Sequence, residues 1–363
     1  MSFTPNYTIT DKLLAYIKRV SELVVGLNQK RFPQVVLVVW ERSARALSAH
    51  ASTSIEGNPL PLTDVKRILK QHPPHVRDSE REVLNYNQAL MDLDNKLDLG
   101  RVDISNQLIL SIHRQVTTKL LPPYESGHYR QKPVVVNNPV TRQIVFMPPN
   151  HEEVPQLVQD LIAYTKQSQD VVDPLILAGI VHKQLVLIHP FMDGNGRTTR
   201  LVTKMLLAEM GLNTFKLFSF ENYYNLNITK YFERVGERGD YCELARKIDF
   251  TGWLEYFVEG IIDELLRVSA LLPAQPLSPK TELLPDQKKL LELMAKKGFA
   301  ADSDYAKITN RARPTRALDF NKLIELGLIA RKGKAKNTYY VLAENWNDYK
   351  ASKVWRIKGD KKA

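Results

Sequence analysis

The stretch that decides the fold reads His189-Pro190-Phe191-Met192-Asp193-Gly194-Asn195-Gly196-Arg197-Thr198-Thr199-Arg200. An apolar segment precedes it, opening at Asp173-Pro174 with a helix N-cap and a proline at the first helical position. A second apolar segment begins near Asn195 and keeps its apolar residues on one face until Gly211. The stretch therefore predicts a polar, glycine-rich loop between two helices.

The residues of this loop are those of an anion site. Gly194 and Gly196 allow the backbone to approach a ligand and turn its N–H groups toward it at a helix N-terminus, where the helix dipole favours negative charge. The side-chain amide of Asn195 would add a donor. Arg197 and Arg200 lie three residues apart on the first turn, and guanidinium groups bind several phosphate oxygens at once. We expect a phosphate-binding loop.

Two further side chains of the loop suggest catalysis on the bound phosphate. Asp193 could hold Mg²⁺, which prefers one or two carboxylates together with substrate oxygens. His189, at the end of the preceding helix, could accept a proton from an attacking hydroxyl. The alternative is a charged helix start beside a core histidine. A GxxxxGK[ST] pattern is absent, which argues against an ordinary P-loop NTPase.

The rest of the first two-thirds of the chain reads as mainly helical, with one exception. Helical spacing of apolar residues recurs from Leu13 to Val24, over 79–99 and over 104–120. Residues 133–147 instead predict a β-hairpin, with Val134, Val135 and Val136, the turn 137–139, and then Ile144, Val145 and Phe146. Residues 35–40 are ambiguous between strand and helix.

The loop matches HPFx[DE]GNGRxxR at every fixed position, so the chain resembles the Fic (filamentation induced by cAMP) family. The resemblance implies a mainly α fold, a Fic helical core with a β-hairpin flap. It also implies AMP transfer from ATP, with Mg²⁺, to a Ser, Thr or Tyr hydroxyl of a target protein, which could be the chain itself. His189 would then be the base, Asp193 the metal ligand, Gly194, Asn195 and Gly196 the anion cradle, and Arg197 and Arg200 the ligands of the distal phosphates.

The resemblance also implies a target-docking flap and a pocket for the base. Val134–Val136 and Ile144–Phe146 would bind the target by main-chain pairing along a strand edge. Tyr231 and Phe232 resemble the aromatic pair that family members place near adenine. Aromatic residues at adjacent helical positions also commonly belong to the core, and that alternative stays open.

An inhibitory segment is expected upstream. Residues 52–58 read Ser-Thr-Ser-Ile-Glu-Gly-Asn, which is similar to the [ST]xxxE[GN] motif of the Fic subclass with an N-terminal inhibitory helix. The motif implies that Ser52, Glu56 and Gly57 are inhibitory. Glu56 would form a bidentate pair with Arg200 and so prevent that arginine from binding the γ-phosphate. The alternative is an ordinary C-terminal helix turn.

Composition places the protein among ordinary globular chains. Of its 363 residues, 44% are hydrophobic and 25% charged. Neither a secretory leader nor an apolar run of membrane-spanning length is evident, so we expect no membrane contact and a cytoplasmic location. The lone cysteine, Cys242, fits a reducing compartment and predicts a small buried side chain.

The positive charge is concentrated at the C-terminus. Of the net +11, residues 276–363 carry 20 Lys+Arg against 10 Asp+Glu. After a proline-rich linker at 271–285, residues 286–363 look like a small winged helix-turn-helix domain, with Arg311, Arg313, Arg316 and Lys322 near its third helix and Arg331, Lys332, Lys334 and Lys336 on its wing. This footprint suits DNA, or equally a protein partner.

The expected domains are thus an N-terminal helical region with the inhibitory helix at 1–100, a Fic catalytic core at 101–270, the linker and the winged-helix-like domain. Two other functions remain: a DNA-binding regulator whose Fic core senses a ligand, and an enzyme that mainly removes AMP from its target. A homodimer is an alternative to a monomer.

Overall fold

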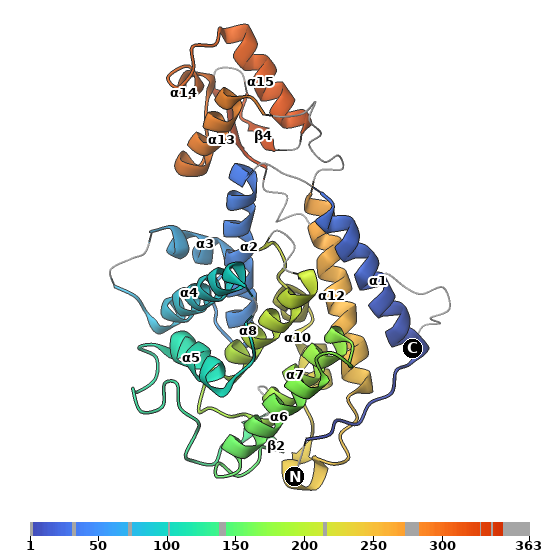
Figure 1. Ribbon diagram of the computed structural model, residues 1–363. Coiled ribbons are helices and arrows are strands. Elements are labelled where there is room, and N and C mark those ends of the chain that lie inside the picture. The colour runs from blue at the N-terminus through green and yellow to red at the C-terminus, as the bar shows by residue number, and fades with distance from the viewer. Residues whose placement is uncertain are drawn as a thin grey trace. The chain divides into compact units, whose positions relative to one another are not determined.

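The fold is mainly helical, as the sequence predicts (Figure 1). The structure is a computed structural model, which describes residues 3–30, 34–71, 75–100, 102–137, 143–212, 216–272, 283–326, 328–334 and 337–343. The helices are α1 (Asp11–Asn28), α2 (Gln34–Ile55), α3 (Leu62–Gln71), α4 (Asp78–Leu99), α5 (Asn106–Thr117), α6 (Val154–Ser168), α7 (Pro174–Ile188), α8 (Asn195–Leu207), the π-helical turn η1 (Ala208–Leu212), α9 (Glu221–Leu226), α10 (Ile228–Val235), α11 (Tyr241–Leu244), α12 (Thr251–Leu271), α13 (Pro285–Lys297), α14 (Asp302–Tyr305) and α15 (Arg313–Glu325).

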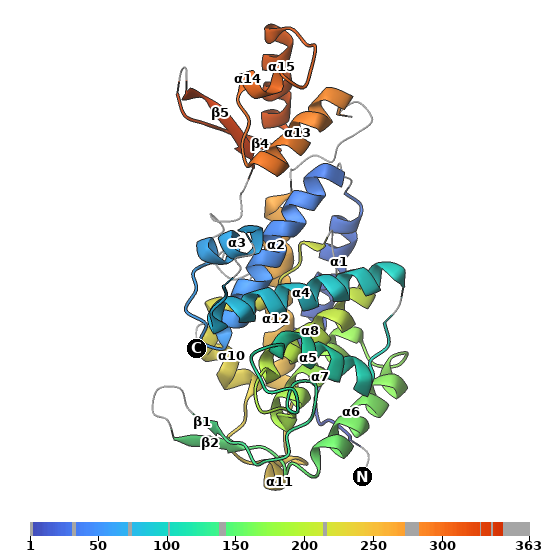
Figure 2. The same ribbon diagram turned by 90° about the vertical axis from the view of Figure 1, so that its left-hand side faces the viewer.

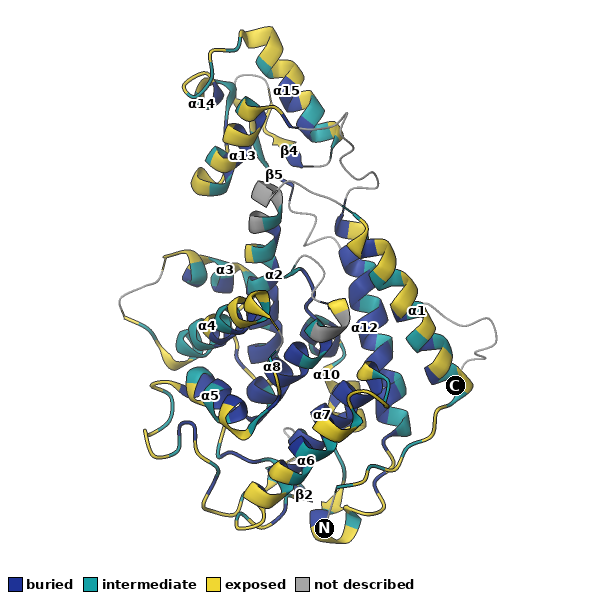
Figure 3. Ribbon diagram, in the orientation of Figure 1, coloured by how far each residue is buried: buried dark blue, intermediate teal, exposed yellow. Residues whose placement is uncertain are grey.

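Helix α7 lies in the middle of the core. Its N-cap Asp173 accepts a hydrogen bond from the Leu175 backbone N–H at 2.9 Å, as the Asp-Pro start predicts. Nearly all of its side chains are buried (Figure 3), because it packs between α6 and α8. A helix that is apolar on all sides belongs inside a protein, and α7 fixes the start of the polar loop there.

The core around α7 is built by helices that are far apart in the sequence. Helices α4 and α5, which contain most of the predicted 79–99 and 104–120 segments, pack against each other and against α8, which also packs against α7. Buried core residues include Tyr86, Leu90, Ile109, Ile112, Val158, Leu161, Val181, Leu185, Leu201, Val202 and Met205. Residues 35–40, which the sequence left ambiguous, are helical as part of α2.

The predicted hairpin is present, with shifted boundaries. Strand β1 (Val136–Asn137) pairs antiparallel with β2 (Ile144–Met147), so Val134 and Val135 lie before the strand. A short third strand, β3 (Gly239–Asp240), pairs parallel with β2 through Phe146 and Met147. The hairpin lies near α11 in Figure 2. The predicted turn residues 138 and 139 lie outside the described residues.

Two compact units can be distinguished. One contains residues 1–24 and 44–264, and the other contains 25–43 and 265–363. Within the second, α13, α14 and α15 are followed by the antiparallel strands β4 (Ile329–Lys332) and β5 (Tyr339–Leu342). This is the element order expected of a winged helix, and that assignment stays a prediction. The predicted linker lies largely outside the described residues, as does Lys336.

Two findings bear on the expectations from composition. Cys242 is exposed, so the prediction of a buried cysteine is wrong, because α11 is a single short turn at the surface. Within the described parts of the chain, none of the helices combines the length and the apolar character that crossing a membrane requires.

Candidate functional site

The loop between α7 and α8 begins at a conformationally unusual histidine. His189 ends α7 with φ 50° and ψ 60°, the left-handed region that a non-glycine residue rarely adopts. Its Nδ1 lies 3.3 Å from the Val186 carbonyl oxygen, which leaves Nε2 available as a proton acceptor if Nδ1 carries the proton. Burial lowers the pKa of His189 below its usual value. The imidazole is therefore neutral at pH 7.

The loop closes on itself through an asparagine. The Asn195 side chain accepts from the Phe191 N–H and donates to the Phe191 carbonyl, both at 2.9 Å. The amide that we expected to face a phosphate instead closes the loop, because Asn195 follows Gly194, whose φ of 77° turns the chain back on Phe191. The backbone N–H groups at the start of α8 remain the anion donors.

His113 on α5, which sequence reasoning missed, supports this loop. Its ring stacks on Phe191 with 3.7 Å between centroids. The Gly127 N–H donates to Nδ1 at 2.9 Å, so Nε2 carries the proton and donates to the Asp193 carbonyl at 3.0 Å. Burial lowers the pKa of His113 to about 4. The only signal in the sequence was a histidine on a helix face that is otherwise apolar.

A second missed residue, Arg130, joins the loop to the base of the flap. Its Nε donates to the His189 carbonyl at 2.8 Å, and its Nη2 donates to the Pro149 carbonyl at 2.5 Å. Its backbone N–H also donates to the Pro190 carbonyl at 2.9 Å. Arg130 therefore fixes the main chain of His189.

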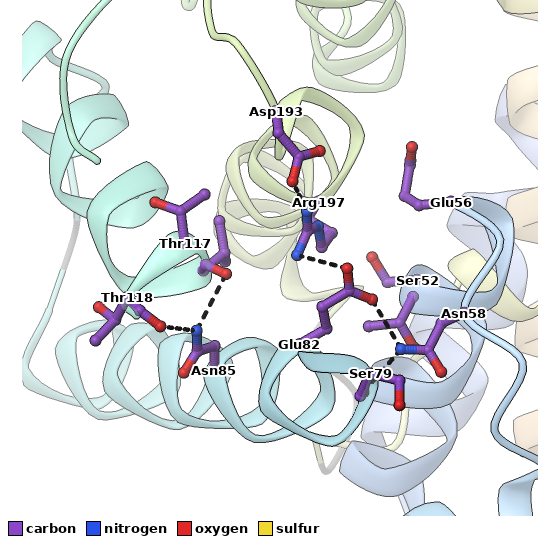
Figure 4. A network of polar contacts seen from close by, with 12 residues as sticks. Ser52, Glu56, Asn58, Ser79, Glu82, Asn85, Thr117, Thr118, Asp193 and Arg197 are labelled. Carbon is purple, nitrogen blue, oxygen red and sulfur yellow. Dashed lines mark hydrogen bonds and ion pairs between the residues drawn. The ribbon is translucent and has the colours of Figure 1, made fainter. Parts of the chain in front are cut away.

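Arg197 is buried between two carboxylates (Figure 4). Its Nη2 donates to Asp193 Oδ2 at 2.7 Å, and its Nη1 lies 3.6 Å from Glu82 Oε1 on α4. In the described part of the chain neither Nε nor Nη1 has a hydrogen-bond partner. A buried guanidinium with unused N–H groups is suited to an anionic ligand.

Arg200, fully buried, is held by the predicted inhibitory segment. Its Nε donates to Ser52 Oγ, and its Nη2 donates to both the Ser52 carbonyl and Glu56 Oε1, all at 2.7 Å. Burial by itself lowers the pKa of Arg200, but the Glu56 carboxylate raises it overall. The predicted bidentate geometry is wrong, because Ser52 occupies Nε and Glu56 reaches a single nitrogen.

The Glu56 carboxylate also lies over the start of α8. A side-chain carbon built on Gly196 would lie 1.9 Å from Glu56 Oε1, so Gly196 must be a glycine for this approach. Gly57, two residues after the end of α2, has φ 92°, a left-handed turn that follows Glu56. The carboxylate therefore lies where the helix N-terminus favours an anion.

Helix α2 has a further polar anchor one turn before Ser52. Lys204 Nζ donates to Ser48 Oγ at 2.7 Å and lies 3.4 Å from Glu221 Oε1. The Tyr86 hydroxyl donates to the same carboxylate oxygen at 2.7 Å. All four side chains are buried. Sequence reasoning missed this network, because its members come from four helices.

The two expected adenine-pocket residues have different environments. Tyr231 is buried, stacks on Tyr224, and its hydroxyl lies 3.0 Å from Nε2 of His182, a fully buried histidine of α7. Burial raises the pKa of Tyr231 to about 12. Phe232, the next residue along α10, is 45% exposed. Tyr231 therefore belongs to the core, and Phe232 alone offers a ring face.

The flap presents apolar side chains to solvent. Val135, Ile144 and Met147 are exposed, whereas Phe146 is buried. Strand β1 is the outer strand of the three-stranded sheet, so its outer edge is available for pairing. This arrangement fits the predicted main-chain docking of a target.

Asp193, the predicted metal ligand, has a carboxylate that reaches solvent while one of its oxygens accepts from Arg197. Its side chain is 55% exposed beside the anion donors of α8. No group of three or more metal-binding side chains occurs among the described residues, so any metal here would depend on substrate oxygens. That donor set suits Mg²⁺, which keeps several oxygen ligands from water or phosphate.

The predicted DNA footprint on α15 is reduced by internal ion pairs. Arg311 binds Asp319 at 2.6 and 2.7 Å, and Arg316 binds Asp302 at 2.8 and 2.9 Å. Arg313 is exposed. The exposed basic side chains of the wing are Arg331, Lys332 and Lys334.

Comparison with known proteins agrees with this geometry. Residues 103–207, from three residues before α5 to the end of α8, match the Fic/DOC family.

These residues form a Fic domain.

Curated relatives of the Fic domain are named as AMP-transferring enzymes. Protein adenylyltransferase fic-1 of Caenorhabditis elegans is 32% identical over 175 residues, 47% of this chain and 33% of the relative. Protein adenylyltransferase Fic of Drosophila melanogaster is 30% identical over 164 residues, 44% of this chain and 32% of the relative. This chain thus spans about a third of the length of these relatives.

Solved structures share the fold over a larger part of the chain. A Fic family protein from Desulfovibrio desulfuricans G20 has a TM-score of 0.64 at 20% identity and covers 94% of this chain and 98% of its own. Fic-1 (residues 134–508) from C. elegans has a TM-score of 0.55 at 23% identity, covering 71% and 72%. The predicted Fic helical core is confirmed.

Proposed function

We propose that this protein is an adenylyltransferase that moves AMP from ATP to a hydroxyl of a target protein. The observation that carries the proposal is the pair of buried arginines, Arg197 and Arg200, with unused N–H groups, converging on the N-terminus of α8. The names of the relatives give the same reaction class. A site of this charge favours a polyphosphate over a neutral ligand.

In the proposed reaction His189 is the general base. Its Nε2 would take the proton of the target hydroxyl while the hydroxyl oxygen attacks the α-phosphorus of ATP. The bond from the α-phosphorus to the oxygen that bridges to the β-phosphate breaks, and pyrophosphate leaves. A neutral imidazole at pH 7 suits this role, and the Arg130 contact to the His189 carbonyl would hold the base in place.

The phosphates would be bound by the first turn of α8. The N–H groups of Gly194, Asn195 and Gly196 would face the phosphate oxygens, and Arg197 and Arg200 would neutralise the distal phosphates. Asp193 would hold Mg²⁺, which when bound offsets the charge on phosphate oxygens and on the leaving pyrophosphate. Phe232 would contact adenine from α10.

We further propose that the resting protein is autoinhibited by Ser52, Glu56 and Gly57. The support is the 2.7 Å contact from Arg200 to Glu56 and the close approach of that carboxylate to Gly196. Both put negative charge where a phosphate would bind. The target, which could be another copy of the chain, would pair with the flap beside Val136 and Ile144.

Labelled ATP tests the reaction. The protein is incubated with α-labelled or γ-labelled ATP in separate tubes, with and without cell lysate. Protein-bound label from the α position alone supports AMP transfer, whereas γ-label retained on protein would indicate phosphate transfer instead. If no label is retained even by Glu56→Gly, the transferase proposal fails and a ligand-sensing core or AMP removal becomes the better hypothesis. Release of AMP from a pre-modified target would identify the latter.

A further inference from the structure

Helix α4 carries a row of polar contacts that reaches both the inhibitory segment and the catalytic loop (Figure 4). The Asn58 side chain donates to the Ser79 carbonyl at 2.8 Å and to Glu82 Oε2 at 2.7 Å. One turn further along α4, Asn85 donates to the Thr118 carbonyl at 2.8 Å, at the end of α5. Helix α4 therefore contacts the turn after α2 and the support of the loop.

Glu82 is the residue of this row that faces the site. While its Oε2 accepts from Asn58, its Oε1 lies 3.6 Å from Arg197 Nη1. The Glu82 side chain is 25% exposed, against 55% for Asp193, the other carboxylate on Arg197. Solvent screens the better-buried charge less, so Glu82 acts on this guanidinium through its charge, whereas Asp193 holds it by a 2.7 Å hydrogen bond.

The 3.6 Å between Arg197 Nη1 and Glu82 Oε1 is the distance of a weak ion pair that can break easily. It exceeds a good charge-assisted hydrogen bond, and the Nε and Nη1 groups of Arg197 have no hydrogen-bond partner among the described residues. The carboxylate balances the buried positive charge but leaves those N–H groups open. Glu82 therefore helps to orient Arg197, and the Nε and Nη1 groups of Arg197 stay available to a phosphate.

The short segment from Ser52 to Asn58 consequently reaches both arginines of the site. Ser52 and Glu56 bind Arg200 directly, whereas Asn58 reaches Arg197 only through Glu82. Neither nitrogen nor oxygen of the Asn58 side chain contacts the loop itself: Nδ2 goes to α4 and Oδ1 accepts from the Leu60 N–H at 3.1 Å.

We propose that Glu82 is a positioning residue that couples the docking of the turn at Asn58 to the orientation of Arg197, and so to nucleotide affinity. This inference rests on the proposed function for the nucleotide, though not on the inhibitory role of Glu56. When the turn is docked, Asn58 fixes the Glu82 carboxylate, which fixes Arg197. When the turn is released, Glu82 is free to rotate and Arg197 loses its second carboxylate. Coupling of this kind acts in both directions, so nucleotide on Arg197 also changes how firmly the turn is held.

The test separates this path from the direct one through Glu56. All variants are made in the whole 363-residue chain carrying Glu56→Gly, in which the direct contact from Glu56 to Arg200 is gone. Asn58→Ala is then expected to weaken binding of a non-hydrolysable ATP analogue, and to raise the KM for ATP, by about three- to tenfold. Glu82→Gln is expected to do the same, because it keeps an acceptor for Asn58 but removes the charge beside Arg197.

The decisive measurement is the double variant. If Asn58 acts through Glu82, adding Asn58→Ala to Glu82→Gln produces no further loss of affinity. Glu80→Gln is the matched control, because Glu80 lies on the same helix but binds Arg77, and it should leave affinity unchanged. Thermal melting checks that each protein is folded, and Asn58→Ser replaces Asn58→Ala if the latter is not. Hydrogen exchange of residues 52–60, faster in Asn58→Ala and slower in nucleotide-bound protein, supplies a second readout.

Two results would overturn the inference: unchanged nucleotide affinity in Asn58→Ala, or additive effects of Asn58→Ala and Glu82→Gln. Calorimetric binding distinguishes this failure from a failure of the proposed function, because it does not require transfer. If Glu56→Gly transfers AMP and the Asn58 effect is missing, only the coupling is refuted. If the coupling appears in binding but no AMP is transferred, only the proposed reaction is refuted.

Discussion

Removal of the Glu56 carboxylate is the sharpest perturbation that the site offers. Arg200 Nη2 now divides its N–H groups between the Ser52 carbonyl and Glu56 Oε1. In Glu56→Gly the contact to Glu56 and the carboxylate over Gly196 both disappear, while Ser52 still binds Nε. We therefore expect faster AMP transfer, with Arg200 turned to the γ-phosphate.

The structure also sets the size of the effect. A hydrogen bond between charged groups is worth roughly 1.5–3 kcal/mol. The Glu56 side chain is 33% exposed, so solvent screening reduces this to about 1–2 kcal/mol, or about 5- to 30-fold in nucleotide affinity. A misplaced triphosphate can in addition cost about 10²-fold in rate. At saturating ATP, where affinity no longer matters, we expect an increase of about 10- to 100-fold.

The assay is the initial rate of self-modification with α-labelled ATP. Glu56→Gln tests whether charge or contact matters and should activate as well, because it removes the negative charge from the anion site. Glu152→Gly, in an exposed turn before α6, is the control for a glycine substitution and should not activate. Arg200→Ala should not activate either, because it removes both the inhibitory contact to Glu56 and the side chain that would bind the γ-phosphate. Unchanged or slower self-modification by Glu56→Gly at saturating ATP would refute the reasoning.

Four other predictions follow from the site. His189→Ala in the Glu56→Gly background should lower the transfer rate by roughly 10²-fold or more, because the proton acceptor is lost. Calorimetry should still detect nucleotide binding, because the anion donors remain. Full activity of this variant would show that His189 is not the base. Burial lowers the pKa of His189, so the base stays neutral at pH values where an ordinary histidine, with a pKa of about 6.5, is half protonated. A pH profile of kcat/KM should therefore retain more than half of its maximum at about pH 6.5. A midpoint of the acid limb at or above about 6.5 would contradict this. Asp193→Ala, or EDTA added to the Glu56→Gly protein, should abolish most transfer, and metal-independent turnover measured with α-labelled ATP would exclude the metal role. Replacing Arg331, Lys332 and Lys334 together by alanine should weaken salt-dependent binding of duplex DNA by the full chain more than Arg313→Ala does; if the unmodified chain binds no DNA at low salt, the C-terminal segment is better explained as a protein-contact domain.

Much of the active loop could be predicted from the sequence because its chemistry is local. The helix start at Asp173-Pro174, the positive-φ glycine at 194 and the arginines on the first turn of α8 depend on neighbours within a few residues. Backbone sterics and helix capping act over that range, so they leave a readable pattern. The hairpin at 133–147 was predictable for the same reason, although its strands are shifted, because β1 depends on its register with β2.

Other features depended on tertiary structure. Asn195 carries the expected amide, but only the folding back of the loop directs it to Phe191. Tyr231 and Phe232 are neighbours with similar side chains, and their environments differ because α10 turns one ring into the core around His182 and the other toward solvent. The burial of each ring depends on helices that are far away in the sequence. It therefore cannot be predicted from the residues next to Tyr231 and Phe232 along the chain.

The sequence by itself determined the anion loop and its candidate base, since both lie within one short motif, whereas the pairing of Glu56 with Arg200, 144 positions apart, was expected only from the resemblance to the Fic subclass. Only the tertiary structure decided how Arg200 is shared between Ser52 and Glu56, and that His113, Arg130 and Glu82 support the loop. These three residues come from two helices and a loop, and each acts through a hydrogen bond or charge across more than fifty positions of sequence. Such contacts leave no periodicity or spacing in the chain, because they are fixed by the packing of α4 and α5 against α8.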